Sequence, residues 1–575
     1  MAVHNEDVAA AFDEMADLLA IQGENPFRIR AYRRAAQVVR TLPRDLAELG
    51  DERRLDELPG IGADLAGKIA ELRATGRLRA LETLRRRVPP GLRALLSLPG
   101  LGPVRVRTLK ARLGIRCIED LDRALSAGRL GSLKGFGSGI ESRLRSALAD
   151  KVARGAQRMS WPIAAEYAEP LRAYLQSIPG VTRAEIAGSY RRGRDTVGDL
   201  DLLVSSRSGA SAIRALRQYE DLRELTAAGT TKASGVLRNG LQVDVRVVAP
   251  QSFGTALHYF TGSRDHNIHI RRRAQTRGCK LNEYGLFRGK RRVAGATEEE
   301  LFAALDLTWI PPELREDRGE IEAAERHALP ELIERRDLQG DLHAHTDASD
   351  GREPLAKLVA AARSRRLRYL AITDHSKYLG VVGGLDAARL ARQIDAIDAL
   401  NEKLSDLVVL KGAEVDILED GQLALPDSIL RRLDVVVVSV HSQFGLSEAR
   451  QTTRVLRALE RPCVSILAHP TGRLLGERPP YAINFERVLQ AARERPCYLE
   501  INGQPKRLDP EDVHVKSARD HGVLLSIASD AHSGAEFAFL DNGIRQARRG
   551  WVTKEDVINT RPVVELRALL RKTMR

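Results

Sequence analysis

The sequence predicts a multidomain α/β protein with a helical N-terminal region, a central domain built on a mixed or antiparallel sheet, and a C-terminal barrel of strands and helices. Glycine-punctuated helical patterns fill the first 155 residues, and acid–apolar alternation marks strands at 199–204 and 241–247. After residue 340, apolar runs repeatedly end in histidine or a carboxylate. A chain of 575 residues has room for three or four domains, each with its own core.

Composition narrows the function classes. Hydrophobic residues make up 43% and charged residues 29%, as in ordinary globular proteins, while the net charge of +14 favours a polyanionic partner. Net charge alone does not distinguish nucleic acid from an anionic membrane as the partner. No apolar run approaches eighteen residues and the N-terminus lacks a signal-peptide profile, so we expect a cytoplasmic protein. The four cysteines are far apart, which predicts neither a disulfide frame nor a thiolate zinc site.

The central strand at 199–204 carries two acids. Residues i and i+2 of a strand share a face, so Asp199 and Asp201 lie side by side and repel unless a cation such as Mg²⁺ binds them. The second alternating strand, 241–247, supplies Asp244 as a third carboxylate. Three acids on adjacent strands can hold two metals roughly 4 Å apart for phosphoryl transfer. The alternative for a bare D-x-D is a solvated edge strand.

Upstream, Gly188 and Ser189 form a turn without bulky side chains, and three arginines at 191, 192 and 194 add charge suited to a triphosphate. The whole stretch 188–204 resembles the nucleotidyltransferase signature of the DNA polymerase beta superfamily, family X. The resemblance implies that Asp199 and Asp201 bind both metals and that Asp244 binds the catalytic metal and faces the primer 3′-hydroxyl. The triphosphate contacts that it implies are Gly188, Ser189, Arg192 and Gly198.

Adjacent aromatics precede a Thr-Gly turn at 258–267. From the pattern alone they are core residues at a strand end. The family resemblance instead implies that Tyr259, Phe260 and Gly262 lie against the sugar and exclude a 2′-hydroxyl, with Asn267 near the base. It also assigns 281–285 to a thumb and places Arg271, in the arginine run 271–273, near DNA.

The N-terminal region carries a basic helix that opens after Pro26, with Arg28 and Tyr32 as candidate DNA contacts. An amphipathic helix with a solvated basic side is an equal alternative. Three glycine turns follow at 58–62, 98–102 and 133–137, and they resemble helix-hairpin-helix motifs, which bind DNA backbones. The alternative for each is a plain helix turn. The candidate glycines are Gly60, Gly62, Gly100, Gly102, Gly135 and Gly137.

Lys68 is the only lysine in the first 109 residues. A lysine can form an imine with an aldehyde and an arginine cannot. Lys68 falls where the polymerase beta family has the lysine that removes 5′-deoxyribose phosphate. Phe27 and Asp64, however, stand where that family has a histidine and a lysine, and an ordinary surface lysine is the alternative.

The C-terminal region repeats strand–helix units whose strands end in metal-binding residue types, which predicts a barrel with its site at that end. Imidazole with carboxylate suits Mn²⁺, Zn²⁺ or Fe²⁺. The region resembles the PHP (polymerase and histidinol phosphatase) domain, a distorted (β/α)7 barrel, and the resemblance implies Mn²⁺-dependent 3′–5′ exonuclease activity, with abasic-site endonuclease or 3′-phosphatase activity as further expectations. The implied ligands are His343, His345, Asp350, His375, Glu414, His441, His469, Asp530 and His532.

Together these features resemble bacterial family X DNA polymerases with a C-terminal PHP domain, which implies gap filling in base-excision repair on gapped or primed double-stranded DNA with dNTPs. We expect a nucleoid-associated monomer that does not bind membranes. A second hypothesis is an untemplated nucleotidyltransferase, but the hairpins and the implied exclusion of a 2′-hydroxyl by Tyr259, Phe260 and Gly262 argue against it. A third is a DNA-end-binding scaffold, but the three aspartates argue against it. The expected boundaries are 1–90 and 91–155 for two helical DNA-binding parts, 156–250 for a palm, 251–315 for a nucleotide-selection and thumb part, 316–337 for a charge-dense linker and 338–575 for the PHP domain.

Overall fold

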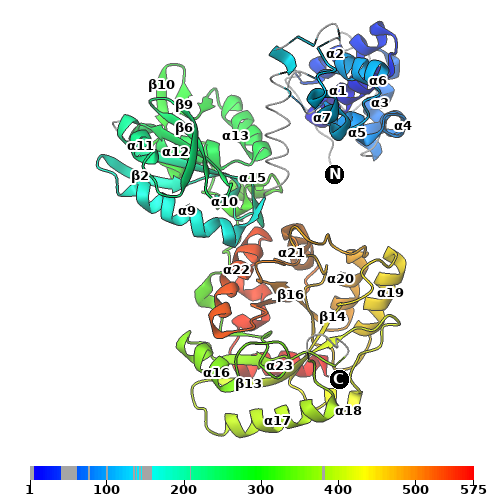
Figure 1. The fold of residues 1–575 in the computed structure, drawn as a ribbon, viewed down its shortest axis with the longest axis vertical. Coiled ribbons are helices and arrows are strands. Elements are labelled where there is room, and N and C mark those ends of the chain that lie inside the picture. The colour runs from blue at the N-terminus through cyan, green and yellow to red at the C-terminus, as the bar shows by residue number, and fades with distance from the viewer. Residues whose placement is uncertain are drawn as a thin grey trace. The chain divides into compact units, whose positions relative to one another are not determined.

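The computed structural model describes residues 5–40, 61–75, 78–96, 98, 101–131, 133, 136–137, 139–141, 144, 158–206, 209–377 and 383–574. The chain divides into two compact units, Met1–Ala156 and Gln157–Arg575. Each unit has its own structure and is described separately (Figure 1). Among the described residues, no helix combines the length and apolar character needed to cross a membrane.

The first unit is helical in its described part, as the glycine-punctuated patterns predict. Phe12, Leu19, Ile69 and Leu109 are among the residues of its single core, to which helices from both ends of the unit contribute. The helix α6 begins with Pro103 at its first position, where the missing N–H costs nothing, and ends at Gly114 in the left-handed conformation. The helices are α1 (Asn5–Gln22), α2 (Pro26–Arg40), α3 (Ala63–Thr75), α4 (Arg79–Arg87), α5 (Pro90–Leu95), α6 (Pro103–Leu113) and α7 (Ile118–Ser126).

The second unit opens with a five-stranded mixed sheet in the order β2-β4-β7-β6-β5. The strands β4 and β7 are parallel, whereas the other neighbours pair antiparallel. A short ribbon of β1 (Met159–Ser160) and β3 (Thr196–Val197) precedes β4. The sheet strands are β2 (Val181–Ile186), β4 (Asp199–Ser206), β5 (Leu222–Ala228), β6 (Lys232–Leu237) and β7 (Gln242–Val248).

Alternation along β4 sorts its side chains between the two faces of the sheet. Leu200, Leu202 and Val204 are buried in a core shared with α9 (Trp161–Gln176) and α11 (Gly209–Leu216). On the other face, Leu203 packs with residues of α12 (Phe253–Thr261). The acids at 199 and 201 therefore lie on the same face as Leu203, opposite Leu200, Leu202 and Val204, as the predicted strand requires.

The next part of the unit pairs a small antiparallel sheet, in the order β10-β9-β8, with three helices. Residues 316–337, expected as a linker, contain the short helix α15, and Ile321 and Leu332 are buried in the same core as Trp551 from the far end of the chain. The elements are α13 (Arg264–Thr276), β8 (Lys280–Asn282), β9 (Gly285–Arg288), β10 (Arg291–Ala294), α14 (Glu298–Ala303) and α15 (Glu320–Glu325).

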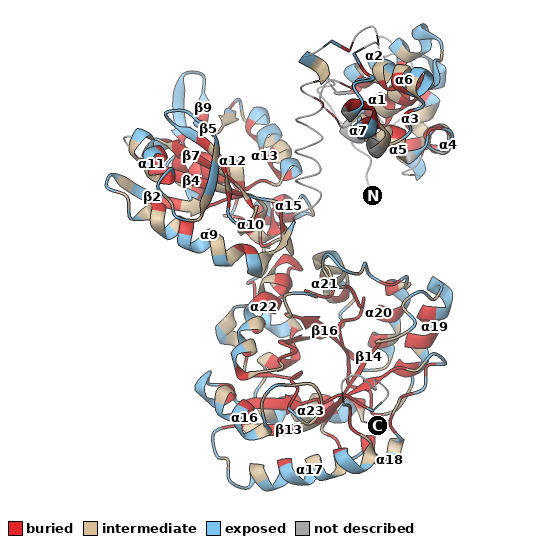
Figure 2. Ribbon diagram, viewed as in Figure 1, coloured by how far each residue is buried: buried red, intermediate tan, exposed pale blue. Residues whose placement is uncertain are grey.

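Seven parallel strands form the C-terminal sheet in sequence order from β11 to β17. A parallel bridge between Ala344 and Ala531 joins the ends of the first and last strands, so the sheet is a nearly closed barrel and the predicted distorted (β/α)7 fold is confirmed. All residues of these strands are buried except Val408 and Lys411 of β13, which are partly exposed (Figure 2). The strands are β11 (Gly340–Asp341), β12 (Tyr369–Ile372), β13 (Val408–Asp416), β14 (Val435–Ser439), β15 (Ile466–Leu467), β16 (Tyr498–Asn502) and β17 (Leu525–Ala528).

Helices follow the barrel strands, as the sequence pattern predicts for 354–366 and 387–400. Their apolar faces, such as Leu358 of α16 and Ile394 of α17, lie in one core with the strands. They are α16 (Leu355–Ser364), α17 (Ala387–Asn401), α18 (Asp427–Leu430), α19 (Glu448–Leu459), α20 (Phe485–Glu494), α21 (Asp512–Asp520), α22 (Leu540–Arg549) and α23 (Val563–Thr573).

Candidate active sites

The three predicted aspartates meet on the mixed sheet. In the parallel pairing of β4 with β7, Asp201 is the direct partner of Asp244, and Asp199 lies two residues earlier on the same strand. Burial, followed by the negative charges of Asp199 and Asp244, raises the pKa of Asp201 to about 7. A buried carboxyl group whose pKa is raised by two neighbouring acids marks a site that a divalent cation would stabilise, so the donor set fits the expected metal.

A cavity of about 620 Å³ opens beside Asp199 and Asp201. Gly188 approaches Asp201 so closely, at a φ of +62°, that an added Cβ would lie 2.6 Å from the Asp201 carboxylate. Asp244 and Gly198 are not among the lining residues, but Gly198 packs against Arg158, which does line the cavity. The predicted nucleotide-binding residues in the lining are Gly188, Ser189, Arg192, Tyr259, Phe260, Gly262 and Asn267.

The three arginines after Ser189 differ in their contacts and in whether they line the cavity. Arg192 lines the cavity, donates to the Thr261 carbonyl and, through Nε, to Glu316 at 3.1 Å. Arg194 also lines the cavity and lies 3.6 Å from Glu316. Arg191 instead forms a bidentate pair with the buried Glu298, at 2.8 Å for both bonds. The predicted charge for a triphosphate therefore comes from two of the three arginines.

The aromatic pair is helical. Tyr259 and Phe260 lie in the last turn of α12, which corrects the alternative that places them at a strand end, and the helix continues until Gly262 ends it at a φ of +69°. Asn267 donates to the Tyr259 carbonyl at 2.7 Å. The guanidinium of Arg271 lies 5.9 Å from the Tyr259 ring centroid, so this predicted DNA contact also lines the cavity.

The predicted C-terminal ligands gather at the carboxyl ends of the barrel strands. Glu414 lies in β13, whereas His375, His441 and His469 follow β12, β14 and β15. Because the carboxyl ends of parallel strands meet at one rim, residues almost two hundred positions apart converge. Asp530 and His532 come from the loop after β17, and His343, His345 and Asp350 come from the loop after β11.

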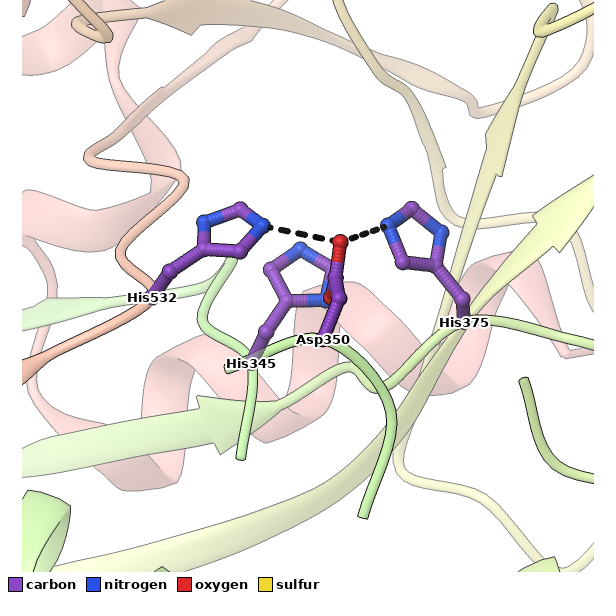
Figure 3. A group of neighbouring side chains, drawn as sticks. All are labelled: His345, Asp350, His375 and His532. Atoms are coloured by element: carbon purple, nitrogen blue, oxygen red, sulfur yellow. Dashed lines mark hydrogen bonds and ion pairs between the residues drawn. The ribbon is translucent and has the colours of Figure 1, made fainter. Parts of the chain in front are cut away.

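Three groups of these side chains have the spacing of metal ligands, and they overlap. In the first, Asp350 Oδ2 lies 3.4 Å from His375 Nε2 and 3.2 Å from His532 Nε2, with His345 beside them (Figure 3). The second is His343, His345 and Asp530, and the third is His375, Glu414 and His441. His469 joins the cluster through its Nε2, 2.9 Å from Glu414 Oε1. All nine predicted ligands thus lie in one cluster.

The electrostatics of this cluster fit bound metal. Burial would raise the pKa of Glu414, but the charges of His375 and His441 hold it well below its usual range. In the described part of the chain, buried imidazole nitrogens without a hydrogen-bond partner include His343 Nε2 and both nitrogens of His345. Lone pairs that converge without donors are costly to bury, and cations that bind nitrogen and oxygen remove this cost.

Two buried acids that are not among the sequence predictions contact histidines of the predicted ligand set. Glu500 Oε1 lies 2.5 Å from His343 Nδ1, and Asp416 Oδ1 lies 3.0 Å from His441 Nδ1. A carboxylate on the far nitrogen of a histidine ligand fixes the ring and its tautomer. The signal in the sequence is an acid inside an otherwise apolar strand, as in β16 and at the end of β13.

In the first unit, each described hairpin glycine lies immediately before a helical turn. Gly62 accepts backbone hydrogen bonds from Leu65 and Ala66, and Gly102 accepts one from Val106. Gly137 does the same for Ile140. The other predicted glycines, Gly60, Gly100 and Gly135, lie outside the described residues. The helix N-termini that the motif requires are thus present in the described part.

The remaining N-terminal candidates differ in exposure. Arg28 is exposed and lies 3.8 Å from Glu24. Tyr32 is 2% exposed and packs edge-on against Phe12, which leaves no ring surface for direct DNA contact. Lys68 lies in α3, where its half-buried ammonium pairs with the exposed Asp64.

These features define a class of enzyme that joins a nucleotidyltransferase site to a separate metal-dependent phosphoesterase site. Family models match along the chain in agreement with this class. They are a helix-hairpin-helix domain (residues 3–78), a SAM-like helix-hairpin-helix tandem (92–150), the DNA polymerase beta palm (164–273), the DNA polymerase beta thumb (256–316) and the PHP domain (341–504).

Known proteins agree with the family models. The DNA polymerase/3′-5′ exonuclease PolX of Bacillus subtilis (strain 168) is 36% identical over 576 residues, covering 99% of this chain and 100% of its own. A probable phosphatase of Thermoanaerobacter sp. (strain X514) is 30% identical over 231 residues, 38% of this chain and 89% of its own. A probable phosphatase of Caldanaerobacter subterraneus subsp. tengcongensis is 31% identical over 233 residues, 38% of this chain and 86% of its own.

The chain belongs to the PolX family, the family X DNA polymerases that carry a C-terminal PHP domain. It is a DNA-directed DNA polymerase with a metal-dependent 3′–5′ exonuclease. Both activities imply divalent metals and DNA as partners, and the polymerase activity implies dNTPs.

Proposed function

We propose that this polymerase fills short gaps in DNA during base-excision repair and trims 3′ ends at its second site. Synthesis takes place at the three aspartates with Mg²⁺, and degradation takes place at the PHP cluster with Mn²⁺ or Zn²⁺. The protein acts as a nucleoid-associated cytoplasmic monomer. The observation that carries the proposal is the pairing of Asp201 with Asp244 beside a cavity lined by arginines, in a chain that also gathers nine histidine and acidic side chains able to bind metal at a barrel rim.

At the polymerase site, the chain's own groups bind and orient the nucleotide. Mg²⁺ held by Asp199, Asp201 and Asp244 would activate the primer hydroxyl and neutralise the transferred phosphate. Arg192 lies at the cavity wall, where its guanidinium can pair with phosphate oxygens. Gly188 leaves room beside Asp201 that any larger residue would fill.

The end of α12 selects the sugar. Tyr259 is 37% exposed and, with Phe260, lines the cavity at the point where the helix ends. A backbone and two rings packed against the C2′ position would leave no space for a hydroxyl group, so the site accepts dNTPs and rejects NTPs. An untemplated enzyme that adds ribonucleotides needs the opposite preference.

At the PHP site, the nine ligands would hold metal, and six of them are buried, whereas Asp350, His441 and His532 are partly exposed. Bound Mn²⁺ or Zn²⁺ would activate water for attack on a phosphodiester. Glu500 and Asp416 keep the rings of His343 and His441 oriented. The same chemistry would act on abasic sites or on 3′-phosphates, which we include as further activities of this site.

One assay on gapped DNA tests both sites together. With Mg²⁺ and dNTPs, Asp244→Asn should reduce extension at least about a hundredfold, because several kcal/mol of charge stabilisation are lost. With Mn²⁺ and no dNTPs, its degradation should be unchanged. The double variant His343→Ala, His345→Ala should show the reverse pattern. Glu224→Gln, which changes an exposed acid on the edge strand β5, is the matched control.

The results distinguish the alternatives. Extension by Asp244→Asn at the wild-type rate would disprove the assignment of synthesis to the three aspartates, and only an absence of extension by the wild type would leave a DNA-binding scaffold. Mn²⁺-dependent degradation that survives loss of both histidines would mean that the nuclease comes from elsewhere. Preference for NTPs over dNTPs, or NTP incorporation that Tyr259→Ala does not increase, would disprove the proposal that the end of α12 excludes a 2′-hydroxyl.

A lyase activity at Lys68 completes the repair proposal. The side chain is half-buried in α3, and the basic helix α2 contributes residues to the same core as α3. Borohydride reduction on DNA with a 5′-deoxyribose phosphate traps an imine covalently. Absence of an adduct, or an adduct that survives Lys68→Ala, would leave Lys68 as an ordinary lysine.

A further inference from the structure

The helix α22 of the PHP domain contacts residues 188–195 of the palm, which are called the nucleotide turn here because they include Gly188, Ser189 and Arg192. One side of α22 carries Leu540, Ile544 and Ala547, which are buried in the barrel core. The opposite side presents Arg545 and Arg549, one helical turn apart, toward the palm. The Arg545 guanidinium lies over the Trp161 ring, 3.1 Å from its centroid.

Arg549 contacts the nucleotide turn at Arg192, which lines the cavity. Its side chain is 2% exposed, and Nη1 donates to the Arg192 carbonyl oxygen at 2.7 Å. Nη2 donates to Glu316 Oε1 at 3.1 Å and also to Asp512. A planar guanidinium can hold three acceptors at once in fixed directions, and an ammonium group cannot hold them in the same plane.

Glu316 connects Arg549 to the Arg192 side chain. The same Oε1 atom accepts from Arg192 Nε at 3.1 Å, so the carboxylate lies between two guanidinium groups. On its other side, Arg192 Nη1 donates to the Thr261 carbonyl in the last turn of α12. The backbone and the guanidinium of Arg192 are therefore both fixed. In the described part of the chain, Nη2 of Arg192 has no hydrogen-bond partner and can bind an anion.

Two further contacts fasten the same turn. Gly193, at a φ of +66°, lies so close to α22 that an added Cβ would be 2.7 Å from Arg545 Cγ. Arg473, whose side chain is 3% exposed, donates to Asp195 Oδ2 at 2.9 Å. Arg473 lies four residues after the predicted ligand His469, so the PHP domain contacts residues 192–195 at three points.

We propose that Arg549, although it belongs to the phosphoesterase domain, is a positioning residue for the polymerase: it fixes Arg192 for binding of the nucleotide phosphates. The inference rests on the proposed nucleotide-binding role of Arg192. It makes tight dNTP binding depend on a docked PHP domain, independently of the metal content of that domain.

The test measures dNTP KM and kcat for the full-length protein on gapped DNA with Mg²⁺, using a nuclease-resistant primer end. Arg549→Ala should raise KM about tenfold or more with kcat within about twofold, because a binding interaction common to the ground state and the transition state is lost. Its Mn²⁺-dependent nuclease activity should be unchanged. In an Arg192→Ala background, Arg549→Ala should add less than about twofold, because the two residues act together.

Arg548→Ala is the matched control. Arg548 is the preceding residue of α22 and docks through Glu313 and the Ile333 carbonyl, away from the nucleotide turn. Its dNTP KM should stay at the wild-type value. An equal rise in KM for Arg548→Ala would show general loosening of the interface and would overturn the inference. So would an undiminished effect of Arg549→Ala in the Arg192→Ala background.

The two proposals fail in different ways. If Arg192→Ala raises KM and Arg549→Ala does not, the inference fails and the proposed nucleotide site stands. If Arg192→Ala itself leaves KM unchanged, the nucleotide-binding role fails first. Arg549→Lys decides the matter if Arg549→Ala does not fold: it keeps the charge beside Glu316 but loses the planar fork. A KM raised about threefold is expected for it, and a wild-type KM overturns the inference.

Discussion

Asp201 and Asp244 face one another across a pair of parallel strands whose residues are more than forty positions apart in sequence. This proximity, together with burial and Asp199, raises the pKa of Asp201 to about 7. In the metal-free protein, two acids so placed oppose folding once they ionise. Without metal, the three acids therefore lower the free energy of unfolding, and the size of this effect depends on pH.

Metal-free Asp201→Asn should be more stable than the wild type at pH 8 and equally stable near pH 4. The pKa of Asp201 is higher in the folded state than its ordinary value of 3.8. The favourable contribution of the protonated carboxyl group is thus fully present below pH 4 and is lost as the pH rises through 7. Thermal unfolding in EDTA measures the difference, and we expect a Tm at least about 2 °C higher at pH 8.

Glu224→Gln is the control for this experiment, since it removes an exposed acid from the same sheet. A Tm for Asp201→Asn equal to that of the control at pH 8 would contradict the raised pKa. Saturating Mg²⁺ should reverse the order, because the wild type gains binding energy that the asparagine variant loses.

Glu500→Gln should weaken metal binding at the PHP site about 10–100-fold. Glu500 contacts His343 Nδ1 through one oxygen and accepts from the His469 backbone N–H at 2.7 Å through the other. An amide cannot orient both ligands in the same way. The Mn²⁺ concentration for half-maximal exonuclease activity measures the effect, and DNA extension with Mg²⁺ should not change.

The control for this variant is Glu494→Gln, an exposed acid at the end of α20, just before β16. If the Mn²⁺ requirement of Glu500→Gln matches that of this control, the carboxylate at 500 has no part in the metal site.

Local periodicity predicted much of the fold and the two sites. Alternation at 199–204 placed Asp199 and Asp201 on one face, and the similar alternation at 241–247 identified the partner strand. In the barrel, each histidine after an apolar run could be found because parallel strands end at one rim. These inferences need only neighbours in sequence or the repetition of one unit.

Other parts depend on contacts that no local pattern carries. Arg549 meets Arg192 across 357 positions, and nothing near either residue indicates the pairing. The three arginines at 191, 192 and 194 could not be distinguished from the sequence. Arg191 nevertheless pairs with Glu298, because α14 brings this buried carboxylate next to it. The aromatic pair at 259–260 suits a strand end as well as a helix end, and only packing against the sheet decides in favour of α12.

Asp64→Asn should increase covalent trapping at Lys68. The Lys68 Nζ contacts the Asp64 carboxylate, so the side chain must leave this contact before its amine can reach an aldehyde. Removal of the carboxylate should raise the yield of borohydride-trapped adduct severalfold. The double variant Asp64→Asn, Lys68→Ala should give none, whereas Lys110→Ala, which removes an exposed lysine of α6, should match the wild type.

A yield for Asp64→Asn no higher than that of the wild type would show that Asp64 does not restrain Lys68. An adduct in the double variant would place the nucleophile on another residue, and the N-terminal amino group would then be the first candidate.

Glu298→Gln should destabilise the second unit by about 3–5 kcal/mol, because it leaves the buried guanidinium of Arg315 and the partly buried one of Arg191 without their anion. Glu298 is 4% exposed and accepts two bonds each from Arg191 and Arg315, the latter fully buried. Burial would raise the pKa of Glu298, yet Arg315 and Arg191 hold it well below the ordinary value of 4.5. The stabilisation is therefore present above about pH 4.5 and is lost as the pH falls further.

Urea unfolding followed by the fluorescence of Trp309, whose Nε1 donates to Glu298 at 3.3 Å, measures this contribution. Glu299→Gln changes the exposed neighbour in the same helix turn and should leave the midpoint unchanged. Arg191→Ala should lower the midpoint as Glu298→Gln does while leaving the dNTP KM near the wild-type value, since Arg191 lies outside the cavity lining. A large rise in KM for Arg191→Ala, with stability intact, would instead return this arginine to the nucleotide site.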